Sequence, residues 1–290
     1  MDVIILRIPG RGCQVTHLSP RELAGVLFSN PDAPEPMTML HCYFDDSGTH
    51  KSSRLAVWAG VTGASGHFMK LDKQWRELLA EPLPGKPALT KFGLADCRGG
   101  HGEFTGYSQG ERDRVRYLFR QTIIQSGMYP FSFAADRKAW DALVTGAMIK
   151  EYACGASGVA FSGCADVALL LAAKIPQSRL ACVFNKGQRN AETLSLIDDA
   201  ESRAERQGVS ITYAFAKVAE VTGLQAADMI ATEHYWYGLE CLDAASGQEP
   251  ILPPHLKNLV TNVKTRAFML QRPEILKLRR EFRATLKKGA

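Results

Sequence analysis

Two apolar runs on either side of a short polar turn constrain the fold of this chain most strongly. The runs are MLHCYFD (39–45) and RLAVWAGV (54–61), both rich in aromatic and β-branched residues, and the segment DSGTHKSS lies between them. This pattern predicts two buried strands joined as a hairpin.

Helices and strands alternate after this hairpin. The apolar periodicity predicts helices at 71–79, 111–126, 140–152, 166–174, 191–206 and 224–237,. Short apolar runs predict strands at 131–135, 180–184 and 211–215,. The segment 166–174 is apolar on nearly all sides, so we expect a buried helix there. A hairpin followed by alternating strands and helices predicts an α/β fold with a mixed sheet flanked by helices.

The two ends of the chain differ from its middle. Residues 1–36 are rich in Gly, Pro and polar residues, and Met37 stands just before the first strand. We interpret 1–36 as an N-terminal extension, either a flexible arm or a segment before the true start. Residues 37–245 then form one domain. Residues 246–290 form a linker followed by a basic amphipathic helix,.

No stretch of the sequence matches a membrane span or a disulfide framework. The most apolar segment, 159–173, is interrupted by polar residues and is shorter than the roughly 20 residues that a span requires,. The N-terminus lacks the basic and apolar regions of a signal peptide,. The seven cysteines are odd in number and widely spaced,. We therefore expect a protein of the reducing cytoplasm that does not bind membranes.

Two acidic positions interrupt apolar sequence and are the strongest candidates for chemistry. Asp45 ends the first strand, with Asp46 beginning the turn after it, and Asp228 lies in the apolar stretch of the 224–237 helix. Asp and Gly are ordinary turn residues, so the first pair alone is also explained by the turn. Asp228 needs a partner, because burying an unpaired carboxylate is costly. That partner could equally be a cation, a basic side chain or a backbone cap.

The motifs around these acids resemble those of the uncharacterised domain-of-unknown-function 3800 family. In chain order they are FDDSG (44–48), ADC (95–97), GEFTGY (102–107), VFNKG (183–187) and LQAADMIA (224–231), and the resemblance spans residues 40–237. It implies a ribonuclease-H-like fold. In such a fold, acids from the first strand, a middle strand and a late helix converge on a divalent metal.

The resemblance assigns roles by position. It implies that Asp45 and Asp228 are catalytic and bind the metal, with Asp46 and Asp96 as further ligands. Asn185 stands at the end of a strand where an acid is expected, and its amide can offer an oxygen but no charge,. Two carboxylates about 4 Å apart repel by about 4 kcal/mol at an effective dielectric near 20, so a cation is needed to hold them together. Oxygen ligands favour Mg²⁺ or Mn²⁺.

The expected function is that of a divalent-metal-dependent phosphodiesterase, a nuclease acting on nucleic acid, in which the metal activates water. Ser47 and His50 in the hairpin turn would contact the substrate. The net charge of +5 and the basic C-terminal helix are compatible with nucleic acid, although that helix is equally compatible with a solvated face,. Two alternatives stay open. One is a catalytically lapsed nucleic-acid-binding or assembly protein, and the other is a hydrolase of a small phosphorylated molecule.

The sequence GYSQG (106–110) matches the G-x-S-x-G motif of serine hydrolases,. That motif needs a buried strand before it, and here a glycine-rich loop precedes it. Ser108 stands three residues before Glu111 at the start of a predicted helix, which is the spacing of a capping box,. We therefore predict that Ser108 caps a helix and is not a nucleophile.

Overall fold

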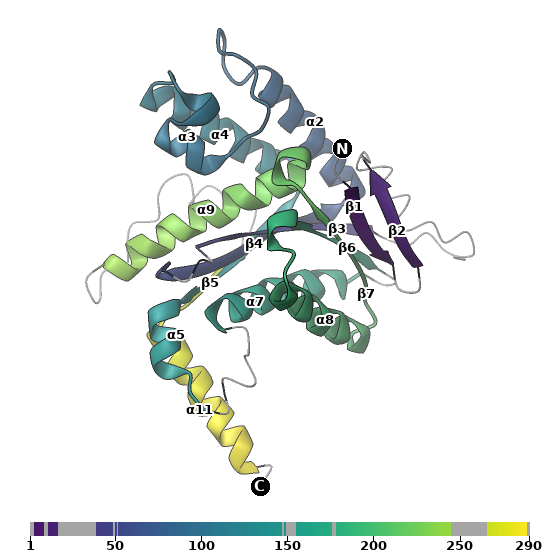
Figure 1. Cartoon of the computed structure of the whole chain (residues 1–290), viewed down its shortest axis with the longest axis vertical. Coiled ribbons are helices and arrows are strands. Elements are labelled where there is room, and N and C mark those ends of the chain that lie inside the picture. The colour runs from purple at the N-terminus through teal and green to yellow at the C-terminus, as the bar shows by residue number, and fades with distance from the viewer. Residues whose placement is uncertain are drawn as a thin grey trace.

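An eight-stranded mixed sheet forms the centre of the molecule (Figure 1). The structure is a computed structural model and describes residues 3–8, 11–16, 39–48, 50, 52–146, 148, 155–175, 178–244 and 266–288. Its strands are β1 (Val3–Ile8), β2 (Arg11–Thr16), β3 (Met39–Ser47), β4 (Leu55–Ala64), β5 (Tyr129–Asp136), β6 (Arg179–Asn185), β7 (Ser210–Ala216) and β8 (Arg266–Leu270). Their order across the sheet is β2-β1-β7-β6-β3-β4-β5-β8.

The five central strands define the topology. Strands β3, β4 and β5 follow one another as an antiparallel meander. Strands β6 and β7 then add in parallel on the other side of β3, each reached through a helix on one face of the sheet,. This is the ribonuclease-H-like arrangement expected from the sequence. The predicted α/β class, a mixed sheet flanked by helices, is confirmed.

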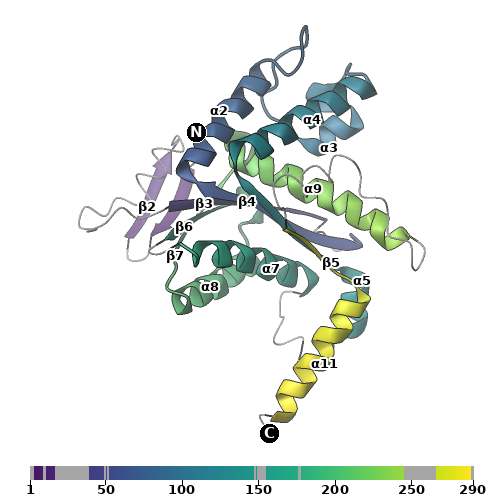
Figure 2. The same cartoon turned by 180° about the vertical axis from the view of Figure 1, so that it is seen from behind.

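Helices cover both faces of the sheet (Figures 1 and 2). One face carries α2 (Ser65–Ala80), α3 (Leu94–Gly99), α4 (Gln109–Ser126) and α9 (Thr222–Asp243). The other carries α7 (Gly155–Ala172) and α8 (Ala191–Arg206). Side chains alternate along a strand, so Tyr43 packs into the core under α9, whereas Phe44 packs into the core under α7,. Covering both faces explains why β3 and β4 are almost continuously apolar,.

Helix α7 is the one helix in the described ranges that is long and apolar enough to cross a membrane. Its side chains Phe161, Cys164 and Ala168 are buried in the core formed with the sheet and α8. The hydropathy of α7 is therefore accounted for by packing, as expected for the buried helix that the sequence predicts at 166–174.

The sheet has more strands than the sequence indicated, because strands near both ends of the chain join it. Strand β1 pairs antiparallel with β7, with Leu6 opposite Ala214, and β2 pairs with β1. These strands lie in the segment interpreted as an N-terminal extension; the suggested start at Met37 lies outside the described residues. Strand β8 pairs in parallel with β5, and α11 (Arg272–Lys288) packs against α5 (Arg137–Leu143).

Candidate functional site

Asp45 and Asn185 lie side by side at the carboxyl ends of two parallel strands. The register of β3 and β6 pairs Phe44 with Phe184, so the next residue of each strand reaches the same edge of the sheet. Asp45 is only 3% exposed, and the Asn185 amide donates to its Oδ1 at 3.4 Å. The structure thus places an amide beside the buried acid at the edge of the sheet where these two strands end.

Gln188 is a residue of this site that the sequence analysis missed. It ends the short 3-10 helix η2 (Lys186–Gln188), and its Nε2 donates to Asp45 Oδ1 at 2.8 Å and also to Asp46 Oδ1. A single amide thus holds both neighbouring acids. The available signal was its place in the first turn after β6, since residues there return to the strand ends.

Helix α9 brings Asp228 to the same region by lying very close to β3. A Cβ atom on Gly223 would come within 2.4 Å of the Tyr43 ring, so only glycine permits this approach. Asp228 is partly buried, and its carboxylate accepts hydrogen bonds from the Leu94 backbone N–H and from Thr232.

The neighbouring motif residue Gln225 positions the loop that faces Asp228. Its Oε1 accepts from the Trp75 indole at 3.0 Å and from the Phe92 backbone N–H at 2.8 Å. These bonds fix the segment just before Leu94, whose N–H contacts Asp228. The LQAADMIA segment thus holds one acid and also the loop that supports it.

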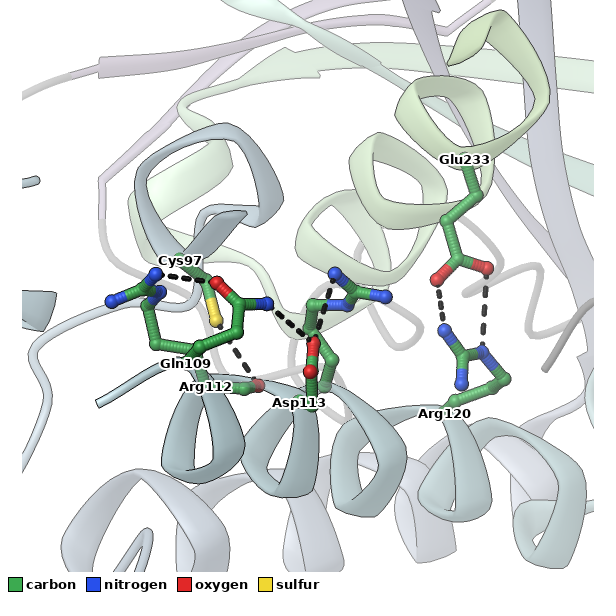
Figure 3. A network of polar contacts seen from close by, with 7 residues as sticks. Cys97, Gln109, Arg112, Asp113, Arg120 and Glu233 are labelled. Carbon is green, nitrogen blue, oxygen red and sulfur yellow. Dashed lines mark hydrogen bonds and ion pairs between the residues drawn. The ribbon is translucent and has the colours of Figure 1, made fainter. Parts of the chain in front are cut away.

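A buried ion pair fixes the rotation of α9 (Figure 3). Arg120 of α4 and Glu233 of α9 are both almost fully buried, and the guanidinium binds both carboxylate oxygens. Removing one partner would leave a buried charge without compensation. The pair therefore fixes α9, the helix that carries Asp228, against α4.

The three acids interact electrostatically. Burial raises the pKa of Asp45 well above its usual value, and the charges of Asp228 and Asp46 raise it further. Burial raises the pKa of Asp228 to about 6, opposed by its hydrogen bonds and by Lys91, and Asp46 adds to the rise. Carboxylates from β3 and α9 are thus close enough for each to disfavour the ionised form of another.

The remaining predicted site residues lie on α3 and in the hairpin between β3 and β4. Asp96 is on α3, with its carboxylate beside Gly93 at the start of that helix. Ser47 ends β3 opposite Val57, and His50 is exposed with its Nδ1 3.1 Å from the hydroxyl of Ser52. Their roles in metal or substrate binding stay predictions.

The chemistry of these donors fits a hard divalent cation, although the ligands are not gathered tightly. Within the described ranges, no cluster of three or more His, Cys, Asp or Glu side chains is arranged to hold a metal ion. The group nevertheless offers carboxylate oxygens from Asp45, Asp46 and Asp228 and an amide oxygen from Asn185. Oxygen donors of this kind match Mg²⁺ or Mn²⁺, whose charge would offset the mutual repulsion of the acids.

No family model matches this chain, and no curated protein is significantly similar to it. Among solved structures, a chain of the PCNA–ribonuclease HII complex from Archaeoglobus fulgidus is similar at 14% identity and a TM-score of 0.39. That similarity covers 76% of this chain and 86% of the other. So distant a likeness supports no activity, and the fold assignment follows from the strand order of the sheet itself.

Proposed function

We propose that this chain is a divalent-metal-dependent phosphodiesterase that cleaves nucleic acid, and that it belongs to the domain-of-unknown-function 3800 family. The observation that carries the proposal is the approach of Asp228 on α9 to the buried Asp45 of β3, whose pKa is raised by burial and by the charge of Asp228. These residues come from opposite ends of the domain. An arrangement that brings like charges together destabilises the metal-free fold, and a bound cation is the simplest compensation.

Each residue of the site has a distinct part in this proposal. Asp45 and Asp228 would hold the cation, with Asp46 and Asn185 completing its surroundings. When bound, the metal supplies activation of water and stabilisation of the departing oxygen. The Gln188 amide orients Asp45 and Asp46 through its two hydrogen bonds. The backbone N–H of Leu94 and the Thr232 hydroxyl orient Asp228 in the same way.

One observation favours a second candidate, a nucleic-acid-binding or assembly protein without catalysis. The amides of Asn185 and Gln188 both donate to Asp45 Oδ1. Two N–H groups thus stand where a cation would bind, and Asn185 supplies no negative charge to attract one. A site that has exchanged its metal for amide donors would keep the fold and lose cleavage.

Metal binding and cleavage separate the two candidates. Calorimetric titration with Mn²⁺ should show binding to the wild type and none to Asp45→Asn, which keeps the shape and removes the charge. Cleavage of single- or double-stranded nucleic acid should require Mn²⁺ or Mg²⁺, stop in chelator and fall at least about 10²-fold in Asp45→Asn. Asp141→Asn, at an exposed position on α5, is the matched control and should behave as the wild type.

The variant Asn185→Asp tests whether the amide is a degraded ligand. A restored carboxylate should tighten Mn²⁺ binding and raise cleavage, because it adds a charged oxygen ligand beside Asp45,. A wild type and an Asn185→Asp variant that are both inert and both fail to bind Mn²⁺ would refute the nuclease proposal in favour of the second candidate.

A further inference from the structure

A cavity of about 420 Å³ lies beside the acids, toward the α7 and α8 face of the sheet. Asp46 and Gln188 line it from the strand ends, and Ser157 of α7 and Leu196 of α8 line it from the helices. Its volume lies within the roughly 300–1,000 Å³ of small-molecule sites. The cavity shares Asp46 and Gln188 with the candidate metal site, so an occupant would adjoin a substrate bound there.

Gln188 lines this cavity, and its side chain carries an unsatisfied acceptor. The side chain is only 7% exposed, and its buried Oε1 accepts no hydrogen bond from any described residue. Its Nε2 is already committed to Asp45 and Asp46. An unpaired buried acceptor is unfavourable, so a ligand N–H or O–H group that this amide turns to meet would be stabilised,.

The other polar groups of the cavity define what kind of ligand fits. The carboxylates of Asp46 and Glu192 are acceptors, and they disfavour a phosphate inside the cavity,. The one cationic lining residue, Arg137, donates to the carbonyl oxygens of Ser53 and Gly48 in the hairpin turn. Trp58 and Leu196 add apolar wall. A ligand that is rich in N–H donors and carries no negative charge matches these walls,.

We propose that this cavity binds a nucleobase that carries an exocyclic amino group. The inference rests on the proposed function, in that the base would belong to the nucleotide whose phosphate lies at Asp45. An amino group offers two N–H donors, which suit Gln188 Oε1 and a neighbouring carboxylate, as when Glu or Asp accepts from the cytosine N4 amino group. Uracil and hypoxanthine present a carbonyl at the same position, which would face acceptors.

Free nucleosides test the inference without metal or phosphate. Ligand-observed NMR titrations in chelator would compare cytidine with uridine and adenosine with inosine, two pairs that differ at the amino position. We expect the amino member of each pair to bind at least about tenfold more tightly, the effect of one well-placed hydrogen bond. Equal binding within both pairs, or no binding of any nucleoside, would overturn the inference.

Substitutions on α8 locate the binding. Leu196→Trp should fill the cavity and weaken cytidine binding at least about tenfold, whereas Ser195→Trp adds the same bulk at an exposed neighbouring position and should not,. Glu192→Gln, at an exposed lining residue, removes one acceptor charge and should reduce the preference for cytidine over uridine even if Leu196→Trp does not fold. Cytidine binding that is unchanged by Leu196→Trp and by Glu192→Gln places the nucleoside elsewhere and refutes the inference.

The two proposals fail separately. Mn²⁺-dependent cleavage that is lost in Asp45→Asn, together with no discrimination between nucleosides, would refute the base site alone. Selective nucleoside binding in a protein that binds no Mn²⁺ would refute the phosphodiesterase alone and leave a nucleobase-binding module.

Discussion

Replacing Asp228 with asparagine should stabilise the metal-free protein at neutral pH and destabilise it slightly in acid. The carboxylate is held on α9 near Asp45 and Asp46, and burial raises its pKa to about 6 from an ordinary value of 3.8. Between these two values the folded chain keeps a proton that the unfolded chain has released. The free energy of unfolding of the wild type therefore falls as the pH rises from about 4 through 6.

The size of the effect follows from the pKa values. A rise from 3.8 to about 6 corresponds to about 3 kcal/mol, which is lost from the wild type above pH 6,. The amide that replaces the Asp228 carboxylate would have one acceptor oxygen for the Leu94 N–H and the Thr232 hydroxyl, which costs about 1 kcal/mol at every pH,. The Asp228→Asn variant should thus be about 1 kcal/mol less stable than the wild type near pH 4 and about 2 kcal/mol more stable at pH 7.

Urea unfolding in chelator, followed by circular dichroism from pH 4 to pH 8, measures the free energy of unfolding of both proteins and the pH at which their curves cross. Asp141→Asn serves as the control, because that exposed acid on α5 should give a curve parallel to that of the wild type. Mn²⁺ added at pH 7 should stabilise the wild type and leave Asp228→Asn unchanged, since binding to the folded state alone raises its stability.

Parallel stability curves for the wild type and Asp228→Asn across this range would refute the reasoning. They would mean that Asp228 is hydrated enough to ionise normally and that the acids do not repel one another. Equal stabilisation of both proteins by Mn²⁺ would show that any cation binds elsewhere.

Three further outcomes are expected. Arg120→Met should lower the free energy of unfolding by about 3–5 kcal/mol, because it leaves Glu233 buried without its partner; a loss below about 1 kcal/mol would mean that water reaches the pair,. Ser108→Ala should cost only about 1 kcal/mol in urea unfolding, since Ser108 caps α4 through a capping box, and loss of a metal-independent esterase activity in this variant would instead identify a nucleophile,. A chain beginning at Met37 should unfold cooperatively within a few degrees of the full chain, because terminal segments seldom carry the core, and loss of cooperativity would show that the β1–β2 hairpin is required,.

The parts of the fold that the sequence predicted correctly are those with a local physical cause. Strands buried on both faces leave continuous apolar runs, so β3, β4 and β6 could be recognised directly,. The predicted capping box is present, because it depends on residues only three positions apart, Ser108 and Glu111,. Asp45 stood out for the same reason, as an acid at the end of a buried strand.

The parts that were missed depend on pairing between distant segments or on backbone conformation. Strand β8 depends on pairing with the edge of β5, a segment more than 100 residues away in the sequence. Gln188 reaches Asp45 through the turn after β6, and its position in that turn was a weaker signal than the charge of an acid in apolar sequence. The helix predicted at 140–152 is interrupted, because α5 ends at Leu143 and Val144 is already extended; residues 149–152 lie outside the described part of the chain.

The buried ion pair between Arg120 and Glu233 limits where a residue can be inserted into α9. Asp228 and Glu233 are five residues apart on α9, and each residue turns a helix by about 100°, so the two side chains leave it about 140° apart,. One is directed toward the strand ends and the other is held by Arg120 of α4. A single residue inserted between them would swing one of the two about 100° out of place, while an exchange of side chains at the intervening positions leaves the angle intact. The number of residues between Asp228 and Glu233 is therefore more tightly constrained than the identity of the side chains between them.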